Sequence, residues 1–149
     1  MGSRRSPVRT PRRKDPPNFA RPPHVHDRNR HPMPAGKPIH IQPKGWGEEH
    51  WIHNGEDYCG KKMFLKKGKR CSLHFHVLKH ETFYISKGKV QMEFVHKDGK
   101  KETFEMNRGD TCEISPGLMH RFTGLEDSEM FEFSTQHFET DSYRVERGD

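Results

Sequence analysis

Short hydrophobic runs separated by turn signals fill the chain from residue 60 onward, and they restrict its fold more than any other feature. The runs are rich in β-branched and aromatic residues and recur about every 8 to 12 residues, which is the spacing of a β-sandwich or barrel. Glycine-containing turn motifs such as "SKGK" and "NRGD" lie between them. The runs cover residues 62–67, 71–78, 81–88, 89–96, 101–106, 110–115, 120–124 and 128–135.

The alternation within these runs is that of strands with one buried face. In "KVQMEFVH", Val90, Met92 and Phe94 share one face, and the polar residues between them share the other. No segment of useful length shows the 3.6-residue apolar period of a helix, so we expect almost no helix. About eight strands in ~90 residues predict an all-β antiparallel fold, either closed or made of two packed sheets, of which the jelly roll is a common form.

The first 38 residues differ in composition from the rest of the chain. They hold 9 of the 11 prolines and ten Arg or Lys against two Asp, whereas the remaining 111 residues hold 17 basic and 19 acidic residues. Such a segment buries too little apolar surface to offset its ordering entropy. We therefore expect a disordered, basic, Pro-rich arm over 1–38 and one domain over 39–149. The arm is either a solvated tail or an electrostatic contact to nucleic acid or another polyanion.

Two further features bear on where the protein resides. No stretch approaches the ~20 apolar residues of a membrane span, and the N-terminus lacks the apolar run of a signal peptide. Cys59, Cys71 and Cys112 form no CxxC pair, and an odd number of cysteines suits a reducing interior. We therefore expect no membrane contact and, by default, a cytoplasmic location.

The stretch "HFHVLKHETFY", residues 74–84, concentrates imidazole and carboxylate groups. His74 and His76 would share one face of a strand ~6.5–7 Å apart, close enough to grip a single ion. Glu81 follows an expected bend and can add an oxygen from the neighbouring strand. His80 is its rival, but adjacent strand residues face opposite sides, so only one of the two turns inward. His120, far downstream, can reach the same place if the barrel closes.

Residues 68–88 and 109–124 resemble the two sequence motifs of the cupin superfamily. The first contains Gly, HxH, Glu and Gly at the family spacing, and the second, "GDTCEISPGLMHRFTG", contains its glycines and final histidine. Ser115 stands where proline is usual and Gly124 where asparagine often closes the motif, which affects the loop and not the ligands. The resemblance implies a cupin double-stranded β-helix, or jelly-roll barrel, that binds a metal; the alternative is a barrel that has lost it. The implied metal ligands are His74, His76, Glu81 and His120.

This implied ligand set defines the kind of metal centre to expect. Three neutral imidazoles and one carboxylate leave one or two positions open on a six-coordinate ion, as a catalytic centre requires. The mixed nitrogen and oxygen set suits Mn(II), Fe(II), Co(II), Ni(II) or Zn(II), and the sequence does not choose among these divalent metals.

The segments flanking the barrel resemble small cupins of the sugar-isomerase type, which include the cupin half of type II mannose-6-phosphate isomerases and the D-lyxose isomerase group. The shared features are a "WG" before the barrel, here Trp46 and Gly47, and an acidic stretch followed by a basic residue, here Glu139, Asp141 and Arg144. The resemblance implies aldose–ketose interconversion of a sugar or sugar phosphate. The metal would hold neighbouring sugar oxygens while a side chain moves a proton between C1 and C2.

Candidate catalytic bases are Glu132 and Glu113, which sit in expected strands. Glu132 alternates with Phe131 and Phe133, so it faces away from the site if the phenylalanines fill the core. Candidate contacts to a phosphate or to sugar hydroxyls are Lys62, Lys89 and Arg121, although a lysine near a turn is usually only solvated.

Three flanking residues have simpler expected roles. We expect Arg144 to pin the C-terminal segment by an ion pair. Trp46 and Trp51 either stack on a sugar face or pack as a lid over the barrel, which is the commoner use of such residues.

Two other functions fit the same frame. An Fe(II)-dependent dioxygenase could use the same ligands and open positions, and a non-catalytic cupin could bind a sugar or metabolite without turnover. By analogy with cupins that pair through β-strands, we also expect a homodimer, with an exposed edge at "MFLKK".

Overall fold

The computed structural model describes residues 35–38 and 40–149. These residues form one compact unit, Ala35–Asp149. The expected disordered arm, and with it the contact to a polyanion, falls almost entirely on residues outside the described part. Within the described residues, no helix is long and apolar enough to cross a bilayer.

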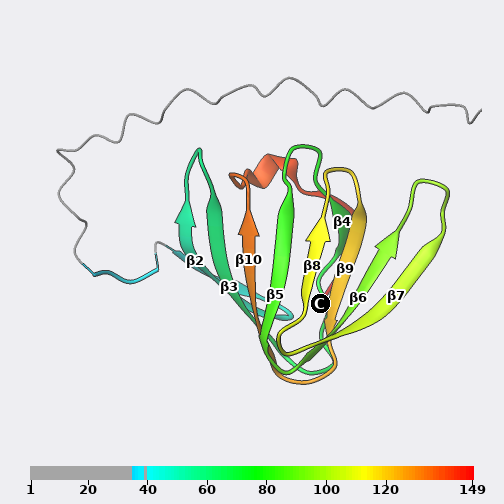
Figure 1. Cartoon of the computed structure of the whole chain (residues 1–149), viewed down its shortest axis with the longest axis horizontal. Coiled ribbons are helices and arrows are strands. Elements are labelled where there is room, and N and C mark those ends of the chain that lie inside the picture. Colours follow the sequence, from blue (N-terminus) through cyan, green and yellow to red (C-terminus); the bar gives the residue numbers. More distant parts are fainter. Residues whose placement is uncertain (1–34, 39) are drawn as a thin grey trace, which may run out of the picture. The chain divides into compact units, whose positions relative to one another are not determined.

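The domain consists of two antiparallel sheets and a single short 3₁₀ turn, Glu139–Asp141, which confirms the all-β jelly-roll prediction. Strands β2, β3, β10, β5 and β8 follow one another across the first sheet in Figure 1, with β4, β9, β6 and β7 in the second. The first sheet has the order β1-β2-β3-β10-β5-β8: β1 His40–Lys44, β2 Gly47–Asn54, β3 Cys59–Leu65, β10 Ser128–Ser134, β5 Glu81–Lys87 and β8 Thr111–Ile114. The second has the order β11-β4-β9-β6-β7: β11 Tyr143–Glu146, β4 Leu73–Phe75, β9 Met119–Gly124, β6 Lys89–Val95 and β7 Lys101–Asn107.

The eight strands expected from residue 62 onward are all present, and the alternation in β6 is confirmed. Val90 and Met92 are fully buried, and Phe94 packs against the core. Strands β1 and β2 lie before the region where the sequence pattern is clear. Their residues are mostly exposed or half-buried, so hydrophobic periodicity gave little signal there.

The pairing register separates the barrel interior into an apolar part and a polar part. On β3 and β10, Met63 is paired with Met130, and two positions further Lys61 is paired with Glu132. All four side chains are buried. The apolar part anchors the fold, and the polar part forms the layer in which the candidate site lies. The apolar core comprises Trp46, Met63, Leu65, Cys71, Phe83, Ile85, Val90, Met92, Met106, Cys112, Ile114, Phe122 and Met130.

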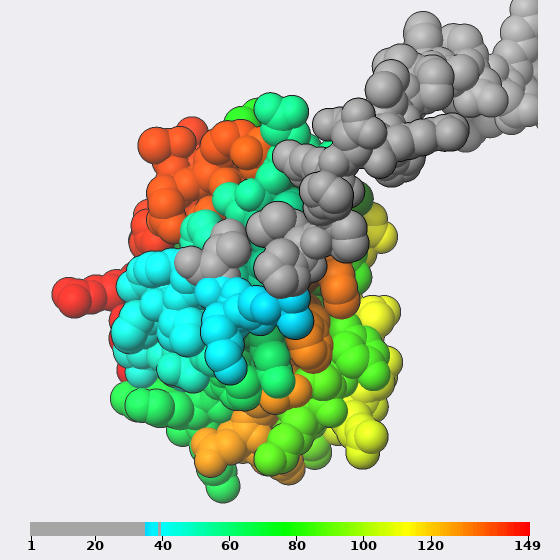
Figure 2. All heavy atoms as spheres, turned by 90° about the vertical axis from the view of Figure 1, so that its left-hand side faces the viewer, coloured from blue at the N-terminus to red at the C-terminus, as the bar shows by residue number. Residues whose placement is uncertain are grey.

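The expected edge at "MFLKK" was wrong, because β3 lies between β2 and β10 and has both sides hydrogen-bonded. The free edges of the first sheet belong to β1 and β8. The edge strand β1 lies on the surface that is cyan in Figure 2, and the side chain of its residue Ile41 is 49% exposed to solvent. The homodimer itself stays a prediction.

Gly47 allows β2 to start against β3. Its φ is +150°, and a Cβ at this position would lie 1.7 Å from the Phe64 carbonyl oxygen. The preceding Trp46 carbonyl accepts a hydrogen bond from Lys66 N at 2.9 Å, and the Trp46 ring packs edge-on against Phe122 inside the barrel. The "WG" pair therefore fixes where the chain enters the barrel.

We predict that Gly47→Ala lowers the free energy of unfolding by about 2 kcal/mol or more, because the added methyl group overlaps backbone. Gly60→Ala is the control, since Gly60 lies in the neighbouring β3 with open space around its Cβ position. Chemical denaturation should show a much smaller effect for Gly60→Ala. Equal effects of the two substitutions would contradict the steric explanation.

Candidate metal centre

Three histidines converge inside the barrel, as the sequence predicted. His74 lies on β4 and His120 on β9, and the two are direct cross-strand partners. His76 follows two residues after His74 and is buried. One ring nitrogen from each lies within 4.8 Å of those of the other two, which is a spacing that can hold one metal ion. The sequence alternation and the β4–β9 pairing together produce this cluster.

Backbone carbonyls fix the orientation of all three rings. His74 Nδ1 lies 2.8 Å from Ser72 O, His76 Nδ1 lies 3.0 Å from Asp141 O, and His120 Nδ1 lies 3.0 Å from Leu118 O. A carbonyl only accepts, so each Nδ1 carries the proton and each Nε2 keeps a free lone pair. This is the tautomer that a metal ligand needs, and the carbonyls are the outer partners that orient such ligands.

Glu81 turns toward the histidines, and His80 points outward with its ring against Glu113. The Glu81 Oε1 atom lies 2.9 Å from His120 Nε2 and 3.6 Å from His76 Nε2. Because Nδ1 of His120 carries the proton, its Nε2 is a hydrogen-bond acceptor. It therefore lies against the Glu81 carboxylate, which is also an acceptor, with no hydrogen to share between them.

This contact provides a test of whether a cation fits. Glu81 Oε1 and His120 Nε2 are both buried and have no hydrogen-bond partner among the described residues. Leaving buried acceptors unsatisfied costs free energy, and a cation between them would satisfy both. The donor set of three imidazoles and one carboxylate therefore fits a divalent metal cofactor, whose identity the geometry does not select.

Burial also keeps the imidazoles in their ligand form. Desolvation lowers the pKa of His74 to about 3, and the neighbouring His120 acts in the same direction. Burial likewise lowers the pKa of His76. Both rings are therefore neutral near pH 7, and neutral imidazole is the form that binds metals.

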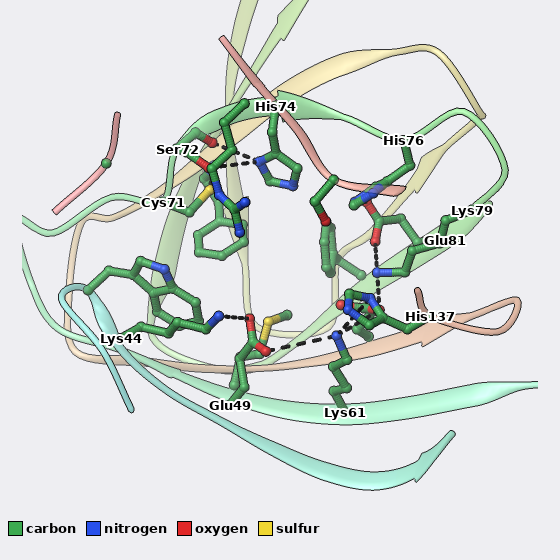
Figure 3. A pocket seen from close by; sticks show the side chains of 18 of the residues that line it. Lys44, Glu49, Lys61, Cys71, Ser72, His74, His76, Lys79, Glu81 and His137 are labelled. Carbon is green, nitrogen blue, oxygen red and sulfur yellow. Dashed lines mark hydrogen bonds and ion pairs between the residues drawn. The ribbon is translucent and has the colours of Figure 1, made fainter. Parts of the chain in front are cut away.

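A buried network of charges adjoins the histidines, and the sequence analysis missed its two lysines. Lys79 Nζ lies 2.7 Å from Glu81 Oε2 and also forms an ion pair with Glu132 Oε1. Lys61 Nζ lies 3.9 Å from the same Glu132 oxygen and 3.2 Å from His137 Nδ1. Figure 3 shows Lys79 beside Glu81, and Lys61 between His137 and Glu49.

Glu132 lies inside the barrel, which resolves the ambiguity left by its flanking phenylalanines. It is only 4% exposed, whereas Phe133 is 57% exposed on the outer face. Burial raises the pKa of Glu132, but the Lys79 and Lys61 ammonium groups outweigh that effect and hold the pKa below its usual value. Glu132 is therefore an ionised carboxylate in the same pocket as His74 and His76.

Glu113, the other candidate base, does not reach the site. It lies on β8, and its exposed side chain is paired to His80 at 2.7 Å. On the neighbouring strand β5, Glu81 faces the interior opposite Ile114, whereas Glu113 is opposite Thr82 and faces outward. The structure brings only one of the two candidate carboxylates to the histidines.

None of the three basic residues expected to contact substrate lines the pocket, because each is paired elsewhere. Lys62 lies 2.8 Å from Glu129, and Lys89 lies 3.7 Å from Glu105. The Arg121 guanidinium is bound by Glu93 and Glu146 at 3.0 and 2.9 Å. Lys62 and Arg121 are each next to an inward-facing residue, so strand alternation turns them outward.

The pocket in front of the histidines has a volume of about 330 Å³. Its apolar wall includes Phe83, Phe122 and Trp46, and its polar wall includes the network just described. Trp46 packs in the core, while Trp51 stacks edge-on against His137 and lies under the Lys61 ammonium. Residues of the C-terminal segment complete the pocket: His137, Glu139, Ser142, Arg144, Arg147, Gly148 and Asp149.

Asp141 holds the loop between the two halves of the first motif. Its carboxylate accepts hydrogen bonds from the backbone N–H groups of Val77, Leu78 and Lys79 at 2.9 to 3.2 Å. Its own carbonyl is the group that orients His76. One buried residue thus shapes the turn that leads to Glu81 and fixes the orientation of the His76 ring. Sequence pattern gave no signal for this role beyond the acidic character of the segment.

The usual proline of the second motif is not needed for the loop before β9. Gly117 N donates to His76 O at 2.6 Å, and Leu118 N donates to Ser115 O at 3.1 Å. These bonds tie the loop directly to the first motif despite the serine.

Comparison with known proteins agrees with this geometry. The family model described as Cupin matches residues 59–146. Among solved structures, oxalate decarboxylase from Bacillus subtilis at pH 4.6 has 21% sequence identity to this chain and a TM-score of 0.64. A second structure of that enzyme, from work on its Mn(II) centres, has 21% identity and a TM-score of 0.65. Both alignments cover 71% of this chain and 30% of the other, so the chain spans about a third of that enzyme's length and the likeness concerns the fold alone. No curated protein sequence matches.

We predict that the purified protein carries about one divalent metal ion per chain and that His120→Gln loses most of it, since each ligand contributes strongly to a four-ligand site. His80→Gln is the control, because it removes an exposed neighbouring imidazole that points away. Elemental analysis of chelator-free preparations measures both. Full metal content in His120→Gln would contradict the assigned ligands.

We predict that Asp141→Asn lowers the free energy of unfolding by about 2 kcal/mol, because an amide cannot accept all the backbone N–H bonds of the loop. Metal affinity should fall about tenfold, as expected when the partner of a ligand is disturbed. Denaturation and metal competition measure the two effects. Asp110→Asn, which disturbs a carboxylate-capped turn between β7 and β8, should alter stability without altering metal affinity.

Proposed function

The chain belongs to the cupin family, and from this premise we propose that it is a divalent-metal-dependent isomerase that interconverts aldose and ketose forms of a sugar or sugar phosphate. The observation that carries the proposal is the position of Glu132. This carboxylate is buried in the pocket that His74 and His76 line, is not itself one of the proposed ligands, and is held ionised by Lys79 and Lys61.

The residues of the pocket support this chemistry in separate roles. A divalent ion held by His74, His76, Glu81 and His120 would polarise the sugar carbonyl. Glu132 accepts the proton from the carbon next to the carbonyl and returns it to the carbonyl carbon, while the hydroxyl proton of that neighbouring carbon passes to the carbonyl oxygen; these two transfers together make up an aldose–ketose isomerisation.

Lys79 and the apolar wall assist the proton transfer. Lys79 contacts both Glu81 and Glu132, so it holds the base in a fixed position relative to the metal ligands. Phe83 and Phe122 exclude water from one side of the pocket. The volume of about 330 Å³ suits a small, sugar-sized substrate.

The same ligand set supports the two competing functions. A dioxygenase would consume oxygen when loaded with Fe(II), and a binding protein would retain a sugar without converting it. An anaerobic panel of aldoses, ketoses and their phosphates, run with each divalent metal, tests for isomerisation, and a parallel aerobic assay of the Fe(II)-loaded protein tests for oxygen uptake. Oxygen uptake with no ketose formation would establish the dioxygenase instead. The homodimer and the cytoplasmic location stay predictions from sequence.

We predict that Glu132→Gln lowers kcat at least about 100-fold, because the amide cannot accept the proton. Metal content should stay near one ion per chain, since Glu132 is not a ligand. The control is Glu113→Gln, which removes an exposed carboxylate on the neighbouring strand pair and should leave kcat unchanged. An active Glu132→Gln protein with wild-type kcat would exclude this residue as the base.

A further inference from the structure

Arg144 on β11 faces the pocket beside a metal ligand. Strand β11 pairs with β4, and Arg144 is the direct cross-strand partner of His74, so the two side chains share a face. The register shifts between Arg144 and Glu146. This bulge lets Glu146 point to the outside, where it binds Arg121, while Arg144 lines the pocket.

Arg144 and Arg147 both line the pocket, and neither has an ion pair or hydrogen bond to any residue that the structure describes. This contradicts the expectation that Arg144 pins the C-terminal segment by an ion pair. The other charged side chains of the pocket have partners: Lys44 with Glu49, Lys61 with Glu49 and Glu132, Lys79 with Glu81 and Glu132, Glu139 with His137, and Asp149 with Lys69 and the Arg70 backbone.

The cationic and anionic side chains that line the pocket are equal in number, and what distinguishes Arg144 and Arg147 is that they have no partner in the described part of the chain. Lys61 and Lys79 balance Glu81 and Glu132, so the buried network is close to neutral. The two unpaired guanidinium groups remain at the pocket wall, and a divalent ion bound by neutral imidazoles would add positive charge near them. Two exposed guanidinium groups without a partner, next to a divalent cation, favour an anionic ligand.

We propose that Arg144 and Arg147 form an anion-binding subsite that holds a phosphate or carboxylate group of the substrate while its carbonyl end lies at the metal. The planar guanidinium fork matches the paired oxygens of either group, and such charge-assisted contacts are stronger than neutral ones. The assignment rests on the proposed isomerase function for the identity of the substrate as a sugar. The substrate is then an anionic sugar, either a sugar phosphate or a sugar acid.

Direct binding measurements test the subsite without turnover. Calorimetry on the metal-loaded protein would compare a neutral hexose, its 6-phosphate and the corresponding hexuronate. At least one of the two anions should bind about tenfold or more tightly than the neutral sugar, with an affinity that falls as ionic strength rises. Which anion binds more tightly distinguishes the sugar phosphate from the sugar acid. Equal binding of all three sugars would overturn the proposal.

Variants assign the effect to the two arginines. Arg144→Gln and Arg147→Gln should each weaken binding of the preferred anion about tenfold or more and leave binding of the neutral hexose unchanged. Arg144→Lys should restore part of the loss, because it keeps the charge but not the fork. The control is Arg108→Gln, which removes the same charge from the exposed turn between β7 and β8. An unchanged anion affinity in a folded Arg144→Gln, Arg147→Gln double variant would also overturn the proposal.

The outcome is separate from that of the proposed function. Arginine-dependent binding of an anionic sugar without any aldose–ketose conversion would keep the subsite and reject the isomerase. Isomerisation that proceeds with the same KM in the double variant would keep the isomerase and reject the subsite.

Discussion

The two ion pairs of Lys79 determine what the interior of this barrel can hold. Glu81 and Glu132 are both buried, and two carboxylates that share a low-dielectric space cannot both stay ionised without a compensating charge. Lys79 contacts both of them and supplies that charge. The pKa values of Glu81 and Glu132 are both held below their usual range, so both carboxylates remain ionised. The two buried carboxylates share this one ammonium group, and Lys61 adds a second, more distant one beside Glu132.

The two-residue period of the strands predicts much of the fold and the inward direction of several site residues. The two-residue period placed Val90, Met92 and Phe94 in the core, and the same rule brought His74 and His76 to one face and required that only one of His80 and Glu81 turn inward. These predictions needed only local geometry. His120 reaches the other two histidines only because β4 pairs with β9. The family resemblance implied this pairing, and residue patterns alone did not.

The positions of the remaining site residues depend on the inward or outward alternation of their strands or on long-range contacts. Lys61 is two residues from Met63 on β3, so the strand alternation already indicated that the Lys61 side chain faces the interior. The same alternation argued against Lys62 and Arg121, which were chosen for their charge. Lys79 lies in a loop without a strand period. Asp141 acts on a loop more than 60 positions earlier in the chain, a contact that no local pattern encodes.

The dependence of His76 on Asp141 has a consequence for how the protein matures. These residues are 65 positions apart, so during synthesis both early histidines leave the ribosome well before the carbonyl that orients one of them exists. Because a domain folds as a unit once its chain is available, the ligand cage reaches its final shape only after the closing segment has docked. Metal acquisition is then a late step of biogenesis, and nascent chains that stall before this point have an incomplete cage.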